Sequence, residues 1–208
     1  FRSADENGEN ADELIGAALC NAEDDIILVS KLGMSLKFQA NDEQLRPMGR
    51  QTAGVQGMKF REGDELLDMD VVWGDSDKDL FVVTNEGFAK RTAISEYRLQ
   101  GRNGFGVKAV QLAEGRGSLV GAVIVEEDDQ IMAIMKSGKV IRSNVDEVKR
   151  TGRTTQGVTF AKPDKNDEII SIARNEEKDD DESAENAENA TVDATVNEGT
   201  AQSSESAV

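Results

Sequence analysis

Arginines framed by glycines carry the clearest chemical signal in this chain. The phrase Gly-Arg-x-x-x-Gly-Val occurs three times, beginning at Gly49, Gly101 and Gly152. A second cation lies four residues after a turn glycine in each repeat, which gives two cations per repeat in register: Arg50, Arg102 and Arg153, and Lys37, Arg91 and Arg142. Cationic groups on glycine-flanked loops can approach phosphates closely, and an evenly spaced array of them fits a polyanion that wraps around successive repeats.

The same cations have a second interpretation. They could be ordinary surface charges, or they could anchor their loops by donating hydrogen bonds to backbone carbonyls. Two glycines and an arginine on one exposed loop are more than a simple chain reversal needs, which favours binding. From the residues alone both interpretations stay open.

The segments between these loops read as short β-strands. They are runs rich in Ile, Leu and Val, and glycine-containing turns at Gly33, Gly87 and Gly138 punctuate them. A single helical turn is predicted at 41–43, 94–96 and 145–147. The predicted strands are 13–20, 25–30, 34–39 and 55–60, then 65–72, 79–84, 88–92 and 107–112, then 118–125, 130–135, 139–143 and 158–161, with a last strand over 168–173.

Four strands in each repeat of about 51 residues predict an all-β fold of propeller-like blades around an axis. The predicted boundaries are 13–63, 64–117 and 118–166 for three blades and 167–174 for a closing strand.

The flanks of the chain are acidic. Residues 176–208 hold eleven acids against Lys178, a net charge of −10 out of −17 for the chain, and are predicted to form a disordered acidic tail. Residues 1–12 are predicted to be an acidic linker or a loop within the blades. The chain begins without Met, so we expect it to be a segment of a longer protein.

Few residues are of the kinds that carry catalysis. The chain has no His, its one Tyr is Tyr97 and its one Cys is Cys20, and we expect the first to be structural and the second to be a buried thiol. No phosphate-binding loop and no metal-ligand spacing is present. No apolar stretch is long enough to span a bilayer. The sequence therefore predicts a binding segment without a metal site.

With Arg46 to Met58 and Ala89 to Tyr97, the Gly-Arg-x-x-x-Gly-Val phrase resembles the C-terminal domain of the DNA gyrase A subunit, of the actinobacterial kind. The resemblance covers about residues 1–175 and implies three blades of a six-bladed β-pinwheel. The defining box of that family, Gln-Arg-Arg-Gly-Gly-Lys-Gly, has its nearest match at residues 100–106, which lack the Lys. The implied DNA-binding residues are Lys37, Arg50, Lys90, Arg91, Gln100, Arg102, Gly104, Gly106, Arg142 and Arg153.

The resemblance also implies a function. Such a domain wraps double-stranded DNA so that ATP-dependent strand passage introduces negative supercoils, in a cytoplasmic, chromosome-associated heterotetramer of two A and two B subunits. ATP and Mg²⁺ are expected on other domains, with no cofactor in this segment. The alternatives are a non-catalytic propeller that binds other proteins and the C-terminal domain of the topoisomerase IV A subunit.

Overall fold

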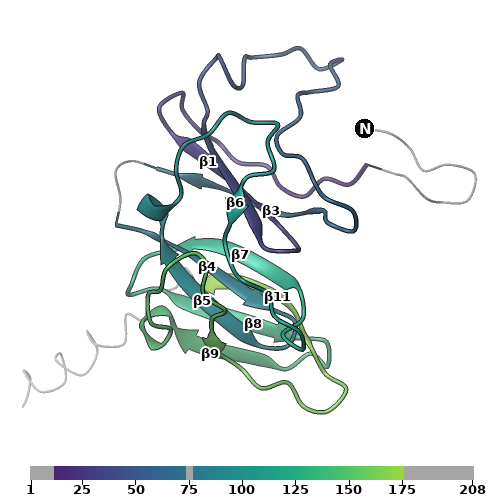
Figure 1. The fold of residues 1–208 in the computed structure, drawn as a ribbon, viewed down its shortest axis with the longest axis vertical. Coiled ribbons are helices and arrows are strands. Elements are labelled where there is room, and N and C mark those ends of the chain that lie inside the picture. The colour runs from purple at the N-terminus through teal and green to yellow at the C-terminus, as the bar shows by residue number, and fades with distance from the viewer. Residues whose placement is uncertain (1–11, 74–76, 176–208) are drawn as a thin grey trace, which may run out of the picture. The chain divides into compact units, whose positions relative to one another are not determined.

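The computed structural model describes residues 12–73 and 77–175, which contain three antiparallel sheets (Figure 1). The regular elements of this part are eleven strands and two short 3₁₀ helices, η1 (Ile94–Glu96) and η2 (Val145–Glu147). The predicted all-β class is therefore confirmed. The predicted acidic tail, and all but Asp12 of the predicted linker, lie outside the described residues.

The first sheet has four strands in the spatial order β3-β1-β2-β6. Strands β1 and β2 form a hairpin whose turn contains Gly33, a glycine with φ +82°. A side chain is strained in this left-handed region, which is why the turn uses glycine. The strands of the sheet are β1 (Asp25–Ser30), β2 (Met34–Gln39), β3 (Leu66–Val72) and β6 (Val107–Lys108).

The second and third sheets repeat this arrangement. The order is β10-β5-β4-β7 in the second sheet and β11-β8-β9 in the third. Glycines with φ +82° and +86°, Gly87 and Gly138, form the corresponding turns. The strands are β4 (Asp79–Thr84), β5 (Phe88–Ala93), β7 (Leu119–Val125), β8 (Gln130–Met135), β9 (Val140–Asn144), β10 (Val158–Thr159) and β11 (Ile169–Asn175).

Each complete sheet takes its two outer strands from later in the chain. β3 and β7, which the sequence assigned to the start of a new blade, pair instead with β1 and β4 of the preceding hairpin. The two-residue strands that follow the second and third Gly-Arg loops also join the preceding sheet, β6 on β2 and β10 on β5. The structure therefore divides the chain at different points from the predicted boundaries, because the hairpin, and not the strand that precedes it, begins each sheet.

Two of the predicted strands do not form in the described part of the chain. Residues 13–20 and most of 55–60 lack strand structure, although Met58 makes a single bridge to Gly104. The corresponding later segments pair with an earlier sheet, and no described sheet precedes these two. Cys20 is exposed as a result, so the prediction of a buried thiol is wrong. The predicted helical turns form at η1 and η2, whereas 41–43 is a non-helical turn.

Apolar residues fill the spaces between successive sheets. One cluster joins strands of the first and second sheets and includes Ile27, Val82 and Tyr97, which is only 2% exposed. A second cluster, with Phe81 and Ile131, joins the second and third sheets. Burial raises the pKa of the Tyr97 hydroxyl, which fits the structural role expected for this residue.

Gly157 lies where the third Gly-Arg loop passes over β5. A Cβ at this position would come within 2.5 Å of the Ala89 carbonyl oxygen, and its φ is +81°. Gly54, at the same place in the first loop, has φ +79° but no atom within 4 Å. We predict that Gly157→Ala lowers the free energy of unfolding by about 3 kcal/mol and Gly54→Ala by about 1 kcal/mol.

Urea denaturation of the two variants measures this difference. Equal losses would show that the close approach of the loop to β5 contributes nothing beyond backbone strain.

Candidate nucleic-acid interface

The arginine of the second Gly-Arg loop fastens that loop to the first repeat. Arg102 donates from Nε to the Gln44 carbonyl at 2.5 Å and from Nη1 to the Gln56 carbonyl at 3.0 Å. Its backbone N–H donates to the side-chain oxygen of Gln44. The guanidinium is half-buried between these carbonyls, so its hydrogen-bonding capacity serves the contact between two repeats.

The third loop repeats the same contacts one unit further on. Arg153 donates from Nη1 to the Lys108 carbonyl at 3.1 Å, and its backbone N–H donates to a Glu96 carboxylate oxygen. Gln56 and Lys108 are equivalent, since each follows the Gly-Val of the preceding phrase. Each of these arginines thus binds the residue after the previous Gly-Val. Arg102 and Arg153 therefore anchor their loops through backbone carbonyls, which was the second interpretation that the sequence allowed.

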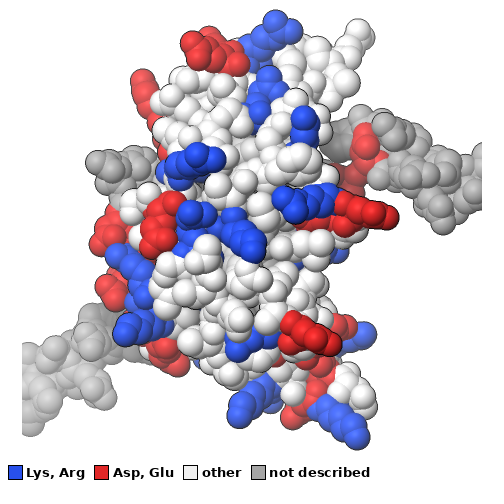
Figure 2. Space-filling view, viewed as in Figure 1, with Lys and Arg blue, Asp and Glu red and all other residues white. Residues whose placement is uncertain are grey.

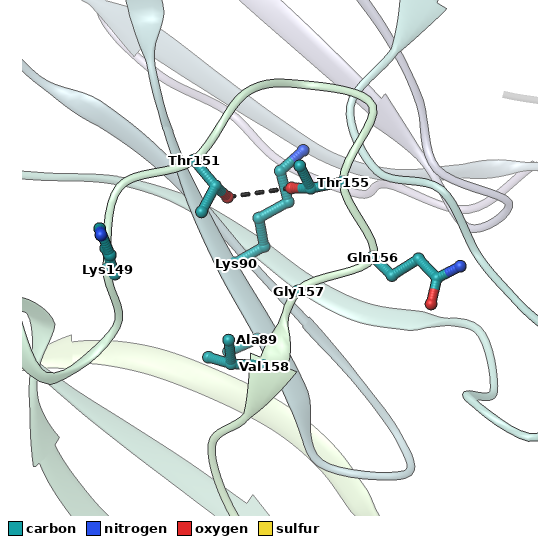
Figure 3. Close-up of a pocket in the computed structure, with 8 residues that line it drawn as sticks. All are labelled: Ala89, Lys90, Lys149, Thr151, Thr155, Gln156, Gly157 and Val158. Atoms are coloured by element: carbon teal, nitrogen blue, oxygen red, sulfur yellow. Dashed lines mark hydrogen bonds between the residues drawn. The ribbon is translucent and has the colours of Figure 1, made fainter.

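Lys90 holds the backbone of the third loop from the protein interior. Its ammonium donates to the backbone carbonyls of Ala109 and Arg153, and the residue is only 1% exposed. A pocket of about 90 Å³ opens beside it, with Lys149 and Gln156 on either side of the lining in Figure 3. Desolvation lowers the pKa of Lys90 to about 8. The structure therefore places this predicted DNA-binding residue inside the protein.

Arg91 belongs to a buried ion-pair cluster at the end of the second sheet. Its Nη1 lies 3.5 Å from an Asp79 carboxylate oxygen, and its Nε donates to the Val148 carbonyl at 2.6 Å. Arg150 binds the same Asp79, with Nε 2.8 Å from Oδ1. Desolvation raises the pKa of Asp79, and its contact with Arg150 opposes that shift. The cluster ties the chain before the third loop to the second sheet.

The three cations four residues after the turn glycines lie at one register position. They face Ile27, Phe81 and Met132 across their hairpins. Two of these cations do not face solvent. Arg91 is buried, and the side chain of Lys37 is 11% exposed, with its Nζ 3.4 Å from an Asp25 carboxylate oxygen. Each of these two cations pairs with a carboxylate at the start of the facing strand, Lys37 with Asp25 and Arg91 with Asp79. Arg142 is exposed.

The remaining predicted residues lie in or next to the loops. Arg50 is exposed, and the Gly104 carbonyl accepts a hydrogen bond from the backbone N–H of Lys59. Gly106 lies against β2, where a Cβ would come within 2.1 Å of the Ser35 carbonyl oxygen. Gln100 is half-buried, and its side-chain nitrogen has no hydrogen-bond partner in the described part of the chain. A DNA-binding role for these residues stays a prediction.

Most of the exposed cations in the described part of the chain lie in three segments that contain no acidic residue, 46–61, 97–113 and 148–163, which we call the acid-free segments. Each contains one Gly-Arg loop. On the face shown in Figure 2, Lys and Arg side chains follow one another along the described part, and Asp and Glu lie mainly towards its margins. Apart from Arg150, which belongs to the Asp79 cluster, the exposed cations of the acid-free segments are Arg46, Arg50, Lys59, Arg61, Arg98, Lys108, Lys149 and Lys162.

Most of these cations were absent from the sequence prediction, which followed residues repeated in register. The lack of Asp and Glu over 16 or 17 residues around each loop was the available signal, in a chain with 41 acids. Arg116 was also missed. It donates to the Gln156 and Gly157 carbonyls and stacks 4.3 Å from the Phe88 ring centroid, and no equivalent arginine in the first repeat predicts it.

No cluster of His, Cys, Asp and Glu among the described residues is arranged to hold a metal ion. Within the same residues, no helix is long and apolar enough to cross a membrane. The candidate site consists mainly of cations and backbone groups, which can bind an anion.

Successive antiparallel sheets that exchange strands through cationic loops define a propeller-type repeat protein. A family model described as the DNA gyrase C-terminal domain, beta-propeller, matches residues 24–72, 78–126 and 129–176. The chain belongs to this family. The three matches begin at or near the first strand of a hairpin and end with the strand that joins the same sheet, as the observed pairing does.

Curated relatives are similar over most of this chain. The DNA gyrase A subunit of Streptomyces coelicolor is 55% identical over 166 residues, which are 80% of this chain and 19% of the relative. The DNA gyrase A subunit of Mycolicibacterium smegmatis is 51% identical over 179 residues, 86% of this chain and 21% of the relative. The chain thus spans about a fifth of the length of these relatives.

Two solved structures share the fold. A DNA gyrase A C-terminal domain is 29% identical with a TM-score of 0.66, over 73% of this chain and 50% of that one. The C-terminal domain of a DNA topoisomerase IV has a TM-score of 0.75 at 22% identity, over 88% of this chain and 56% of that one. The second is a likeness of fold alone.

Lys90 makes the stability of the fold depend on pH. Its pKa is about 8 in the folded state against 10.5 as the ordinary value, so the unfolded state binds more protons between these values and stability rises with pH. We predict that the free energy of unfolding rises by about 2 kcal/mol from pH 8 to pH 9.5 relative to Lys90→Met. Chemical denaturation at several pH values measures the rise.

The window ends below pH 10 because Tyr97, whose pKa is raised, opposes the rise at higher pH. Parallel pH profiles for the wild type and Lys90→Met would contradict the buried, charged Lys90.

Proposed function

We propose that this chain binds and bends duplex DNA through the exposed cations of its acid-free segments. The observation that carries the proposal is that each of the three repeats offers one such segment beside a Gly-Arg loop. A duplex that crosses successive segments would exchange its counterions for these side chains at every step. The phosphate contacts would offset the several kcal/mol that bending a duplex costs, without reading base edges.

The chain would perform this as part of a DNA gyrase A subunit. Support comes from the family to which it belongs and from relatives of that name at 45–55% identity. The wrapped DNA would then enter strand passage so that negative supercoils result. The nucleophile, ATP and Mg²⁺ would be located on other domains, in a complex of two A and two B subunits that acts on the chromosome in the cytoplasm.

Two other functions are less well supported. The topoisomerase IV C-terminal domain shares the fold, but it is only 22% identical to this chain in sequence. A platform for protein binding would present aromatic anchors, whereas only Trp73, Phe60 and Phe105 are exposed large aromatics in the described part, and Phe105 stacks with Arg61. The cation pattern therefore favours DNA.

The test compares two sets of three cations. Arg46, Arg98 and Lys162 are exposed and lie one in each acid-free segment. We predict that changing all three to Gln weakens binding to unrelated duplexes by similar factors and reduces the slope of log K against log salt by about 2.7, or 0.9 per phosphate contact. Mobility shifts at several salt concentrations measure both quantities.

The matched control changes Lys31, Lys136 and Lys139 to Gln. These lysines lie at the hairpin turns and pair with Glu65, Glu168 and Asp164. The control removes the same charge and should leave the slope unchanged. Equal effects of the two triple variants would mean that net charge, and not the acid-free segments, governs binding.

A further inference from the structure

The second and third Gly-Arg loops differ in the residue that lies under them. Leu36 and Lys90 are equivalent, since each follows the residue that pairs with the valine of its loop, and they are 0% and 1% exposed. A buried ammonium costs more free energy than a buried leucine unless hydrogen bonds and an anion compensate it. Because the second loop docks over an apolar side chain, docking itself does not require a cation under the third.

Among the described residues, the Lys90 ammonium uses two of its three N–H donors. The backbone carbonyls of Ala109 and Arg153 accept from it. No carboxylate in the described part of the chain forms an ion pair with it, whereas the adjacent Arg91 pairs with two carboxylates. An anion beside Lys90 would accept from the third donor and would balance its charge.

The pocket beside Lys90 has room for such an anion. It measures about 90 Å³ and is lined by both arms of the third loop, with the Lys90 side chain between them in Figure 3. One water needs roughly 10–15 Å³ of such space, so the pocket can hold a group of several polar atoms. Its lining includes the exposed Lys149 and contains no Asp or Glu among the described residues. The pocket is therefore suited to negative charge.

The Thr155 hydroxyl can donate to an anion in this pocket. It donates to the Gly152 carbonyl at 2.9 Å, and the same carbonyl accepts from the Thr155 backbone N–H at 3.2 Å. If the hydroxyl turns its proton towards the pocket, that carbonyl keeps a partner. The Thr151 hydroxyl, 3.0 Å from that of Thr155, holds it in place. The second loop has Gln100 and Gly104 at these two positions and so has neither hydroxyl.

We propose that this pocket binds one phosphate group. Lys90 and Lys149 would supply the positive charge and Thr155 a hydrogen bond, and phosphate oxygens accept from all three kinds of donor. The source of the group rests on the proposed function: a duplex that crosses the third acid-free segment would place a backbone phosphate here. A free phosphate ion would make the same contacts. The third loop would thus hold the duplex at one fixed point, through a cation that is not exposed.

Titration with inorganic phosphate tests the pocket without DNA. Amide chemical shifts of the 208-residue chain should change saturably, most of all at residues 151–158. Thr155→Val should weaken phosphate binding about fivefold, because it removes one hydrogen bond. Thr154→Val is the matched control, since Thr154 is exposed in the same loop and does not line the pocket, and it should bind as the wild type does.

Proton uptake tests the role of Lys90. Its pKa is about 8; the charges of Glu96 and Arg153 act on it, and Lys149 lines the same pocket. An anion in contact with the ammonium raises this pKa, so binding at pH 8 should take up to about half a proton from the buffer. Calorimetry with sulfate, which does not titrate at this pH, in buffers of different ionisation enthalpy measures the uptake. Lys90→Leu, which copies the second loop, should abolish the uptake and weaken binding about tenfold.

A duplex added to the same sample identifies the source of the phosphate. If the source is DNA, the duplex should shift the same amides and displace inorganic phosphate. Shifts with phosphate alone would keep the pocket and assign it to the free ion, whatever the salt slopes of the triple variants show. No saturable shift at tens of millimolar phosphate, equal weakening by Thr155→Val and Thr154→Val, or sulfate binding that Lys90→Leu leaves unchanged would overturn the proposal.

Discussion

The two-residue strands that follow the second and third Gly-Arg loops make the interaction on which the arrangement of the sheets depends. β6 and β10 each complete the preceding sheet, and a glycine with positive φ sets the loop directly against that sheet. The loop arginine then fixes the distance to the repeat before by binding a backbone carbonyl. A change in one loop would therefore alter the angle between two sheets, because a strand, a glycine contact and an arginine contact all lie at the same place.

This arrangement divides the cations of one loop between two tasks. Arg153 donates a hydrogen bond to the Lys108 carbonyl of the neighbouring repeat, and the buried Lys90 donates to the loop backbone at the Arg153 carbonyl. Lys149, in the same loop region, is exposed and is available to a polyanion. Buried cations set the geometry of the repeats, while under the proposed function the exposed ones would contact the phosphates. The path of a bound duplex would then be determined by contacts between neighbouring repeats that do not themselves touch DNA.

The strand ranges and turns were predictable because they depend on local patterns. Apolar runs bounded by glycines correctly placed both strands of all three hairpins, and the glycines at 33, 87 and 138 have the positive φ that the turns required. Sheet membership was not predictable in this way. β3 is contiguous in sequence with the second repeat but pairs with β1, and nothing in residues 64–72 encodes the partner. The pairing of β3 with β1 joins segments far apart in the sequence, and local sequence patterns do not predict such a pairing.

The candidate site was predictable only in part for a related reason. Periodicity identified the arginines of the loops but could not tell an exposed guanidinium from one bound to a carbonyl, since both occur at fixed spacing. Lys37 and Arg91 recur because carboxylates at the start of the facing strands, Asp25 and Asp79, recur with them. Composition around the loops, free of acids, was the better guide to the exposed surface.

A comparison of Arg153→Gln with Lys149→Gln, two changes four residues apart, most directly tests this division of tasks. The quantities are the free energy of unfolding and the salt dependence of binding to duplex DNA. The account predicts that Arg153→Gln loses about 1–3 kcal/mol of stability and changes the salt slope little, whereas Lys149→Gln keeps its stability and reduces the slope by about 0.9. A stable Arg153→Gln variant whose slope falls as far as that of Lys149→Gln would contradict the account.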